Sequence, residues 1–344
     1  MKKILQNSIK GIVSPLVAVL LAFLVGALLM KAAGNNPIAA YASLFKGAFG
    51  SNHRIAETVV RAIPLIILAL GISIAFKAQL WNIGGDGQFT VGAIFAVFVA
   101  LTFPLSNAML LPLTLIAAFI GGACWGGIAG FFKAKFNANE VITTLMLNYI
   151  ALYLLEWLVK GPMMDPKGHG FPQTELINEG LRLPILLEGT RLHMGLFVAL
   201  VLVMGVYMFW RTTLGFKTEV VGQSREVARY SGIKVNKIII ITMFISAGLA
   251  GLAGWTEVFG VHYRLLENVS GGFGNLAIVV ALLANLNPWG IVVSGFFFAA
   301  LVTGGNTMQR MEGVPFALVD VILGLTIIFV ISRVVYRRWR DKQC

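Results

Sequence analysis

The polar side chains most able to bind a solute gather at two glycine-rich stretches of this sequence. They are Asn82, Asp86, Gln88, Asn306 and Gln309. The first three lie in residues 81–88 (WNIGGDGQ) and the other two in residues 303–315 (TGGNTMQRMEGVP). Amides and carboxylates hydrogen-bond polar solutes, and burying a charged one in a membrane costs several kcal/mol. We interpret the five residues as candidates for a solute path, although Asp86 also suits the cap of a following helix.

Paired basic side chains mark another stretch, residues 211–237. Ser224 can cap the start of a short helix there and Gly232 can end it, leaving about two turns between them. Arg225 and Arg229 then stand four residues apart on one face, and such a like-charge pair weakens an isolated helix by a few tenths of a kcal/mol. This face requires an acidic partner, which is either another protein or anionic lipid.

Motifs for catalysis are absent from the sequence. It contains no GxxxxGK[ST] phosphate-binding loop, no GxSxG nucleophile elbow and no HExxH metal motif. The histidines are isolated, and the two cysteines, Cys124 and Cys344, make neither a disulfide framework nor a CxxC metal pair. The sequence therefore predicts a protein that is not an enzyme and needs no metal or cofactor. Any nucleotide-driven work is expected to come from another subunit.

The composition is that of an integral membrane protein. Hydrophobic residues make up 58% of the 344 residues, charged residues 12%, and the mean hydropathy is +0.83, whereas soluble domains carry about a quarter charged residues. The net charge of +12 would suggest nucleic acid in a soluble chain. Here the basic residues stand at the ends of apolar runs, where they set the orientation in the membrane, so we expect no nucleic-acid partner.

The apolar runs predict an all-α polytopic protein with about ten transmembrane helices and both termini in the cytoplasm. The spans are expected at about residues 12–30, 58–76, 89–103, 108–132, 140–159, 192–210, 238–255, 275–284, 290–302 and 316–332. A short interfacial helix is expected at residues 40–48, and Asn139 is expected to cap the fifth span.

The order of the spans predicts one transmembrane domain, residues 1–344, made of two inverted five-helix halves. Residues 160–191 and 303–315 then form external loops, and residues 211–237 lie in the cytoplasm. Glycine-rich breaks fall at matching places in the two halves, at residues 81–88 and 268–274, and are expected to open toward opposite sides of the membrane. Interrupted helices at corresponding positions of inverted repeats indicate a transport path.

Several stretches, in order, resemble permease subunits of ATP-binding-cassette importers, in the group that handles ribose and other simple sugars, nucleosides and branched-chain amino acids. The first, WNIGGDGQFTVGA, resembles the family's FNIGxEGQ motif, with Asp86 where a glutamate is expected. The others are NEVITTLMLNYIALYL, VGQSREVARYSGIKV, SGGFG and NTMQRMEGVPFALVDVILG. In the third, Gln223 and Ser224 replace a more acidic or Asn-Pro-like pair. The resemblance covers residues 43–331 and is greatest to nucleoside-type permeases.

The resemblance implies that residues 222–232 form a coupling helix that docks in a groove of the ATPase subunit. The residues assigned to this coupling are Gly222, Ser224, Arg225, Glu226, Arg229 and Gly232. It also implies an ATPase with two nucleotide-binding modules, a second permease subunit, usually a paralogue, and an extracytoplasmic solute-binding protein. The two external loops would face that binding protein on the outer side of the bacterial inner membrane.

The resulting prediction is a permease subunit that moves a nucleoside or a simple sugar inward, with energy from a separate ATPase. Trp81 or Phe273 could stack on a base. The alternative is an ion-coupled secondary transporter, which would share the inverted halves but would need an ion site and no ATPase. Uptake that persists without the ATPase and collapses with the ion gradient would favour this alternative.

Overall fold

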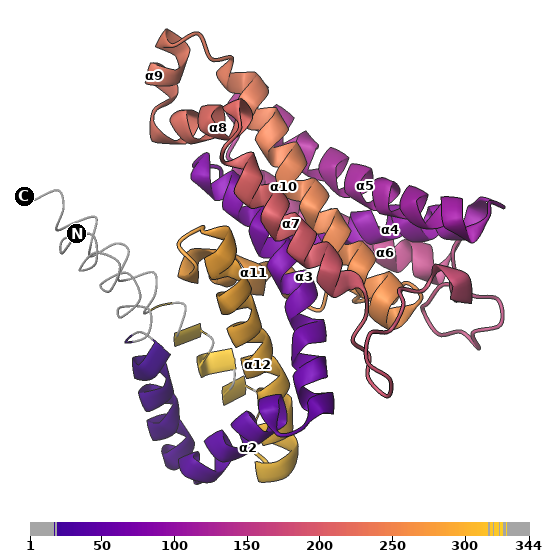
Figure 1. Cartoon of the computed structure of the whole chain (residues 1–344), viewed down its shortest axis with the longest axis vertical. Helices are drawn as coiled ribbons and strands as arrows, with labels where there is room; N and C mark the ends of the chain where they lie inside the picture. Colours follow the sequence, from indigo (N-terminus) through magenta and orange to yellow (C-terminus); the bar gives the residue numbers. More distant parts are fainter. Residues whose placement is uncertain are drawn as a thin grey trace, which may run out of the picture. The chain divides into compact units, whose positions relative to one another are not determined.

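The computed structural model describes residue 17, residues 19–315 and residues 317–318, 320–322, 324–325 and 328. Parts of the first and tenth predicted spans, and the basic residues near both termini, lie outside the described residues. The described residues form helices and connecting segments (Figure 1). The helices are Val19–Ala32, α2 (Pro37–Phe49), α3 (Asn52–Lys77), α4 (Gly85–Thr102), α5 (Asn107–Phe136), α6 (Glu140–Lys160), η1 (Glu179–Leu181), α7 (Gly195–Phe209), α8 (Thr213–Gln223), α9 (Arg225–Tyr230), α10 (Val235–Glu257), η2 (Val258–His262), α11 (Phe273–Leu283) and α12 (Pro288–Glu312).

The predicted polytopic all-α architecture is confirmed. Within the described residues, six helices are long and apolar enough to cross a membrane, namely α3, α4, α5, α6, α10 with η2, and α12. The pair α7 and α8 adds a seventh if it counts as one span bent by 70°, and two apolar helices, Val19–Ala32 and α11, are shorter. The number of ten spans, and the inverted arrangement of two halves, stay predictions.

The contacts divide the chain into two compact units. One joins residues 1–58 to residues 297–344, and the other is residues 59–296. In the first unit the end of α12 packs on α2: a Cβ on Gly304 would lie 2.4 Å from the carbonyl oxygen of Leu44, and a Cβ on Gly47 would lie 2.4 Å from Thr307 Cβ. The Ser43 hydroxyl donates to Glu312 Oε1 at 2.6 Å, which ties the two helix ends together.

This packing corrects the expected external loop at residues 303–315, because α12 continues to Glu312 and only residues 313–315 are irregular. Glycines such as those at positions 304 and 305 are common in turns. In the structure Gly304 instead allows the helix backbone to approach α2, and Gly313, with φ of +66°, ends the helix four residues after Gln309. A glycine inside a helix costs about 1 kcal/mol relative to alanine, and close packing offsets that cost.

In the second unit, small residues let α4, α5 and α10 approach closely. A Cβ on Gly92 of α4 would lie 2.2 Å from Gly251 Cα of α10, and a Cβ on Gly122 of α5 would lie 2.4 Å from the carbonyl oxygen of Ala247. α5 and α10 lie side by side over much of their length (Figure 1). Small residues at such contacts allow van der Waals packing that holds helices together in lipid, where the hydrophobic effect contributes little.

Polar groups fix the start of α6. Asn139 caps the helix, its side-chain oxygen accepting from Val141 N at 3.0 Å, as the sequence predicts. Glu140 also forms an ion pair with Lys133 at 2.8 Å, and both side chains are largely buried. The pair joins the end of α5 to the start of α6 across the left-handed turn at Asn137, so the first-turn carboxylate has a specific partner as well as the helix dipole.

Candidate functional site

The two glycine-rich breaks meet inside the second unit. The Asp86 carboxylate, in the first turn of α4, accepts a hydrogen bond from Gly274 N at 2.8 Å, in the first turn of α11. The residue before α11 is Gly272, which has φ of +80° and no side chain to cap the helix. Asp86 supplies that missing acceptor from another helix. The two breaks are therefore in direct contact in this conformation, and the sides of the membrane toward which they open stay a prediction.

Glycines on both sides of this contact allow the two helix starts to approach closely, and position 274 leaves no room for a side chain. A Cβ on Gly274 would lie 2.4 Å from Asp86 N, and a Cβ on Gly85 would lie 3.2 Å from Gly274 Cα. The rings of Phe89 and Phe273 pack beside the contact with their centroids 6.3 Å apart. The junction therefore combines two helix starts, one buried carboxylate and two aromatic rings, and any added side chain would push the two helices apart.

Asn82 and Gln88 form the second part of the site, four residues before Asp86 and two residues after it. Asn82 Nδ2 donates to Gln88 Oε1 at 3.0 Å and to Ser246 Oγ of α10 at 3.0 Å, while Gln88 Nε2 donates back to Asn82 Oδ1 at 2.8 Å. Asn82 Oδ1 also accepts from Gly84 N at 3.1 Å. Both amides are almost fully buried, so in this conformation they hold the break in shape and tie it to α10.

Asn148 of α6 completes the network, and the sequence analysis did not select it. Its Oδ1 accepts from Gly87 N at 2.7 Å, and its Nδ2 donates to the Ile83 carbonyl oxygen at 3.0 Å. Thr144 Oγ1 accepts from Ile83 N at 3.3 Å. Glu140, Thr144 and Asn148 recur every four residues and are all buried, so a polar stripe along an otherwise apolar helix was the available signal.

The other two candidates for the solute path lie in the first unit. Asn306 is partly buried and Gln309 is exposed, and both belong to α12. The Asn306 carbonyl oxygen accepts from Arg310 Nε at 3.1 Å. One helix therefore brings these two amides together, three residues apart, and both amide side chains remain available for hydrogen bonding within the described residues.

The structure forms the short helix that the sequence predicts in residues 211–237. Ser224 Oγ accepts from Val227 N at 3.3 Å and caps α9, and Gly232, with φ of +75°, ends it. Arg225 is partly buried, while Arg229 and Glu226 are exposed. Two apolar side chains are exposed beside them, Tyr230 at 93% and Val227 at 57%. A surface that combines arginine with exposed aromatic and aliphatic groups is typical of the core of a protein interface.

Gly222 connects this helix pair to the rest of the second unit. A Cβ on Gly222 would lie only 2.0 Å from the carbonyl oxygen of Lys77, the last residue of α3. Lys77 Nζ also lies 4.1 Å from the centre of the Trp210 ring, at the end of α7. Because Asn82 follows Lys77 by five residues, the helix pair α8 and α9 abuts the segment that leads directly into the first break.

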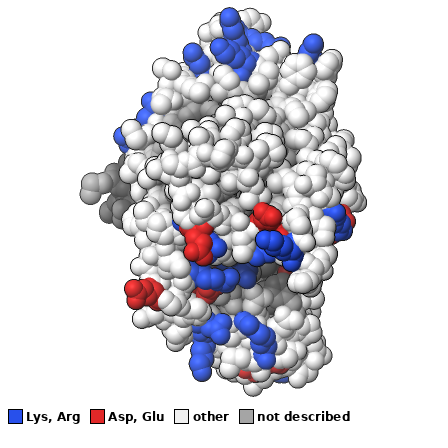
Figure 2. Space-filling view, turned by 90° about the vertical axis from the view of Figure 1, so that its right-hand side faces the viewer, with Lys and Arg blue, Asp and Glu red and all other residues white. Residues whose placement is uncertain are grey.

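Basic residues gather at the end of the molecule that carries α8 and α9. Figure 2 shows lysine and arginine gathered at the upper end of the face it presents, the end at which Figure 1 places α8 and α9, with a wide band free of charged residues below. Residues 211–237, which contain α8 and α9, are rich in exposed basic residues, among them Arg211, Arg229, Lys234 and Lys237. A basic end beside an uncharged band is what the positive-inside rule predicts for a cytoplasmic loop.

The chain matches the family described as branched-chain amino acid transport system, permease component, over residues 54–331. It is 35% identical to the guanosine ABC transporter permease protein NupP of Bacillus subtilis over 92% of each chain. It is also 35% identical to the nucleoside permease NupB of Lactococcus lactis, over 95% of this chain and 92% of that one. The glucose permease TsgB13 of Haloferax volcanii is 35% identical over 95% of this chain and 89% of its own.

Proposed function

Because the chain belongs to the family of branched-chain amino acid transport system permease components, we propose that it carries a nucleoside inward across a bacterial cytoplasmic membrane. It is a multi-pass membrane protein and a permease subunit of an ATP-binding-cassette importer. Two of the similar relatives are named for guanosine and for nucleosides, and one for glucose. A simple sugar is accordingly the second candidate solute.

For the solute path we propose Asn82, Asp86, Gln88, Asn306 and Gln309. The observation that supports the first three is a buried polar junction between two interrupted helices, a combination that marks solute sites in transporters. Beside Asp86, residues 271, 272 and 275 are exposed, so a solute can approach the start of α11. Trp81, with 47% of its surface exposed, is available to stack on a base.

We further propose that a separate ATPase subunit docks on α9 and that its motion reaches the junction through Gly222. The coupling residues are Gly222, Ser224, Arg225, Glu226, Arg229 and Gly232. A push on α9 is transmitted by α8 to the end of α3, where Gly222 touches the Lys77 backbone. The first break begins a few residues after Lys77, and Asn82 in it is bonded to Ser246 of α10. A push on the end of α3 therefore acts on the break and on its contact with α10.

A permease subunit of this family works with an ATPase, a solute-binding protein and a second permease. We propose that the ATPase carries two nucleotide-binding modules and hydrolyses the ATP, and that the second permease is a paralogue. Both termini and residues 211–237 are placed in the cytoplasm in this proposal. Residues 160–191 face the extracytoplasmic solute-binding protein, and the whole chain serves as one transmembrane domain.

The test is uptake of labelled guanosine by cells that express the complete importer, competed with unlabelled adenosine, ribose and leucine. Nucleosides should compete, and leucine should not. Arg225→Glu together with Arg229→Glu should abolish both uptake and co-purification of the ATPase, because the basic face then repels its acidic partner. A control with Lys31→Glu and Lys46→Glu, both exposed and outside α9 and residues 160–191, should keep both uptake and co-purification.

Two outcomes would contradict the proposed mechanism, and a third would change the proposed solute. Unchanged co-purification of the ATPase with the arginine variant would remove α9 as the docking element. Uptake that persists in cells lacking the ATPase, and that collapses when the ion gradient is dissipated, would favour an ion-coupled secondary transporter. Competition by ribose but not by nucleosides would keep the importer and change its solute to a sugar.

A further inference from the structure

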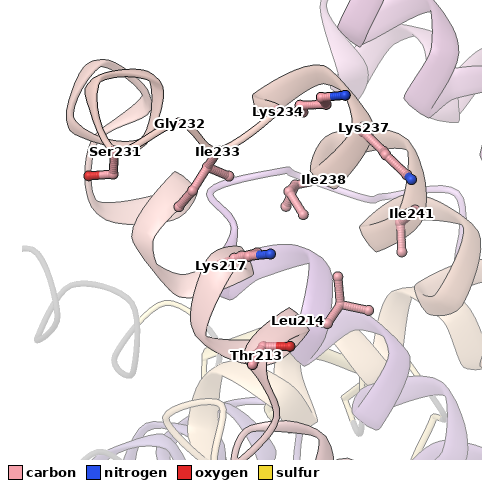
Figure 3. A pocket seen from close by; sticks show the side chains of 10 residues that line it. All are labelled: Thr213, Leu214, Lys217, Ser231, Gly232, Ile233, Lys234, Lys237, Ile238 and Ile241. Atoms are coloured by element: carbon pink, nitrogen blue, oxygen red, sulfur yellow. The ribbon is translucent and has the colours of Figure 1, made fainter.

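A cavity of about 480 Å³ lies beside α9, between α8, the turn after α9 and the first two turns of α10. Its lining has two chemical parts. Lys217 comes from α8, and Lys234 and Lys237 come from the start of α10 (Figure 3). Leu214, Ile238 and Ile241 form the apolar part. In Figure 3 the Ile238 side chain lies between Lys217 and Lys237, so the charged and apolar parts face the same space.

The three lysines have no negative partner in the described part of the chain. The ion pairs found there include those of Lys133 with Glu140 and of Lys160 with Glu267, and none of them uses Lys217, Lys234 or Lys237. The nearest carboxylate in sequence to Lys217 is Glu219, and a residue two positions along a helix points to another face. Three like charges around one cavity repel each other, and this repulsion is relieved by an anion between them.

The backbone adds to the positive potential of this cavity. α10 begins at Val235 after Lys234, and no side chain caps its start. The first N–H groups of this 23-residue helix therefore have no side-chain acceptor, and they carry the positive end of the helix dipole. Uncapped N–H groups together with nearby ammonium groups are the usual setting for a bound phosphate. Arg225 and Arg229 do not line the cavity, whereas the coupling residue Gly232 does, so this site adjoins the proposed docking face of α9 without using its arginines.

The apolar part of the lining decides between the sources of a phosphate. Ile238 and Ile241 belong to α10, which is long and apolar enough to cross a membrane, so the apolar lining continues from the basic end along a candidate membrane span. A free phosphate ion gains nothing from contact with Leu214 or Ile241. A phospholipid places its phosphate among the lysines and its glycerol and first methylenes on the apolar side chains.

We propose that this cavity binds the headgroup phosphate of an anionic phospholipid. The lipid would sit beside α8 and α10 and hold the turn between α9 and α10 at the membrane surface. Basic pockets between membrane helices bind anionic headgroups in this way, and each lysine near the surface contributes about 1 kcal/mol, or about fivefold in affinity. The site thereby links the position of α9 to the lipid composition of the membrane.

The experiment uses the full chain, purified in mild detergent after extraction from membranes that contain phosphatidylglycerol and phosphatidylcholine. Bound lipid is counted by native mass spectrometry. The variant K217Q/K234Q/K237Q should retain at least about tenfold less phosphatidylglycerol, given about fivefold for each lysine. The control K31Q/K46Q/K167Q removes the same charge at exposed positions outside the cavity and should retain the wild-type amount. Phosphatidylcholine retention should be equal in all three proteins.

A second arm separates lipid from free phosphate. Leu214→Asn should lower phosphatidylglycerol retention severalfold, and millimolar inorganic phosphate should not displace the lipid. Displacement by phosphate, with no effect of Leu214→Asn, would overturn the lipid assignment. Equal lipid retention by the lysine variant and its control, with loss of ATPase co-purification in the lysine variant alone, would show that the lysines bind an acidic segment of the ATPase instead.

Discussion

At the scale of single residues, the candidate site depends on hydrogen bonds that one helix makes for another. Asp86 caps α11 from α4, and Asn148 of α6 accepts from Gly87 N in the first turn of α4. An uncapped helix end buried in an apolar environment costs several kcal/mol for each unsatisfied group. The interrupted helices therefore persist only while the partner side chains stay in place, and each such side chain can be tested separately.

Asp86 has two possible roles, as the cap of α11 and as a negative charge in the solute path, and two substitutions distinguish them. Asp86→Asn keeps an oxygen for Gly274 N but removes the negative charge, so the melting temperature in detergent should hardly change while nucleoside uptake falls. Asp86→Ala removes the acceptor as well, and should cost about 1–2 kcal/mol of stability. Glu175→Ala, an exposed carboxylate, serves as the control. Full uptake by Asp86→Asn would show that the charge has no part in the solute path.

Burial also makes His193 sensitive to pH. The ring is 1% exposed and packs against Gly195 and Gly260, and its Nδ1 accepts from Gly195 N at 3.1 Å. Burial lowers the pKa of His193 from 6.5 to about 4, against a smaller opposing effect of Glu257. The folded state then binds fewer protons than the unfolded state between these two values, so stability is lost as the pH falls through this window.

The expected loss on acidification from pH 7 to pH 4 is up to about 3 kcal/mol, from 1.36 kcal/mol for each pKa unit. Melting temperatures in detergent across this range should show it. His193→Asn keeps an acceptor for Gly195 N without a titrating ring, and should flatten the acid side of the curve. His169→Asn, which changes an exposed histidine, should leave the curve as it is. Identical curves for the two variants would rule out His193 as the source.

At the scale of elements, the contact of α8 with the end of α3 carries the proposed coupling. Gly222→Ala places a Cβ 2.0 Å from the Lys77 carbonyl oxygen, and this backbone atom cannot move aside cheaply. The change should cost about 1–3 kcal/mol and lower uptake by displacing α8 and α9. Gly205→Ala is the matched control, because nothing lies within 4 Å of the added atom. Equal uptake by the two variants would contradict the proposed route.

Helix boundaries that depend on local signals could be predicted from the sequence. Asn139 and Ser224 cap α6 and α9 as expected, and Gly232 ends α9. Boundaries set by tertiary contacts could not. α12 passes through Gly304 and Gly305 because its backbone packs on α2, and α10 continues as the π-helix η2 to His262. Neither extension has a marker in the local sequence.

Some features of the candidate site could likewise be predicted from the sequence, and others depend on tertiary contacts. Glycines around Asp86 and Asn268 identified both breaks, because glycine allows backbone angles that other residues resist. The contact between the breaks joins residues 188 positions apart, and no spacing rule reaches that far. The pairing of Lys133 with Glu140 was missed for a related reason, since it depends on how α5 turns into α6. The polar stripe containing Asn148 was readable, and it was not used.

At the scale of the whole molecule, the orientation in the membrane is the premise of the coupling proposal. A chain with Cys124 and Cys344 changed to serine and Tyr230 changed to cysteine tests it, because Tyr230 is 93% exposed on α9. A membrane-impermeant maleimide should label this cysteine only after the cells are permeabilised. A cysteine in place of Lys167, in the segment predicted to be external, should be labelled in intact cells. Labelling of position 230 in intact cells would refute the cytoplasmic assignment.

The capping of one helix by another also constrains how the protein is made. Ribosomes complete Gly87 61 residues before Asn148, and Asp86 188 residues before Gly274. Until these partners exist, Gly87 N in the first turn of α4 lacks its acceptor and the Asp86 carboxyl group lacks its donor, and lipid can supply neither. The insertion machinery must shelter α4 until α6 and α11 have been translated, so chains truncated before residue 274 should be substrates for membrane proteases.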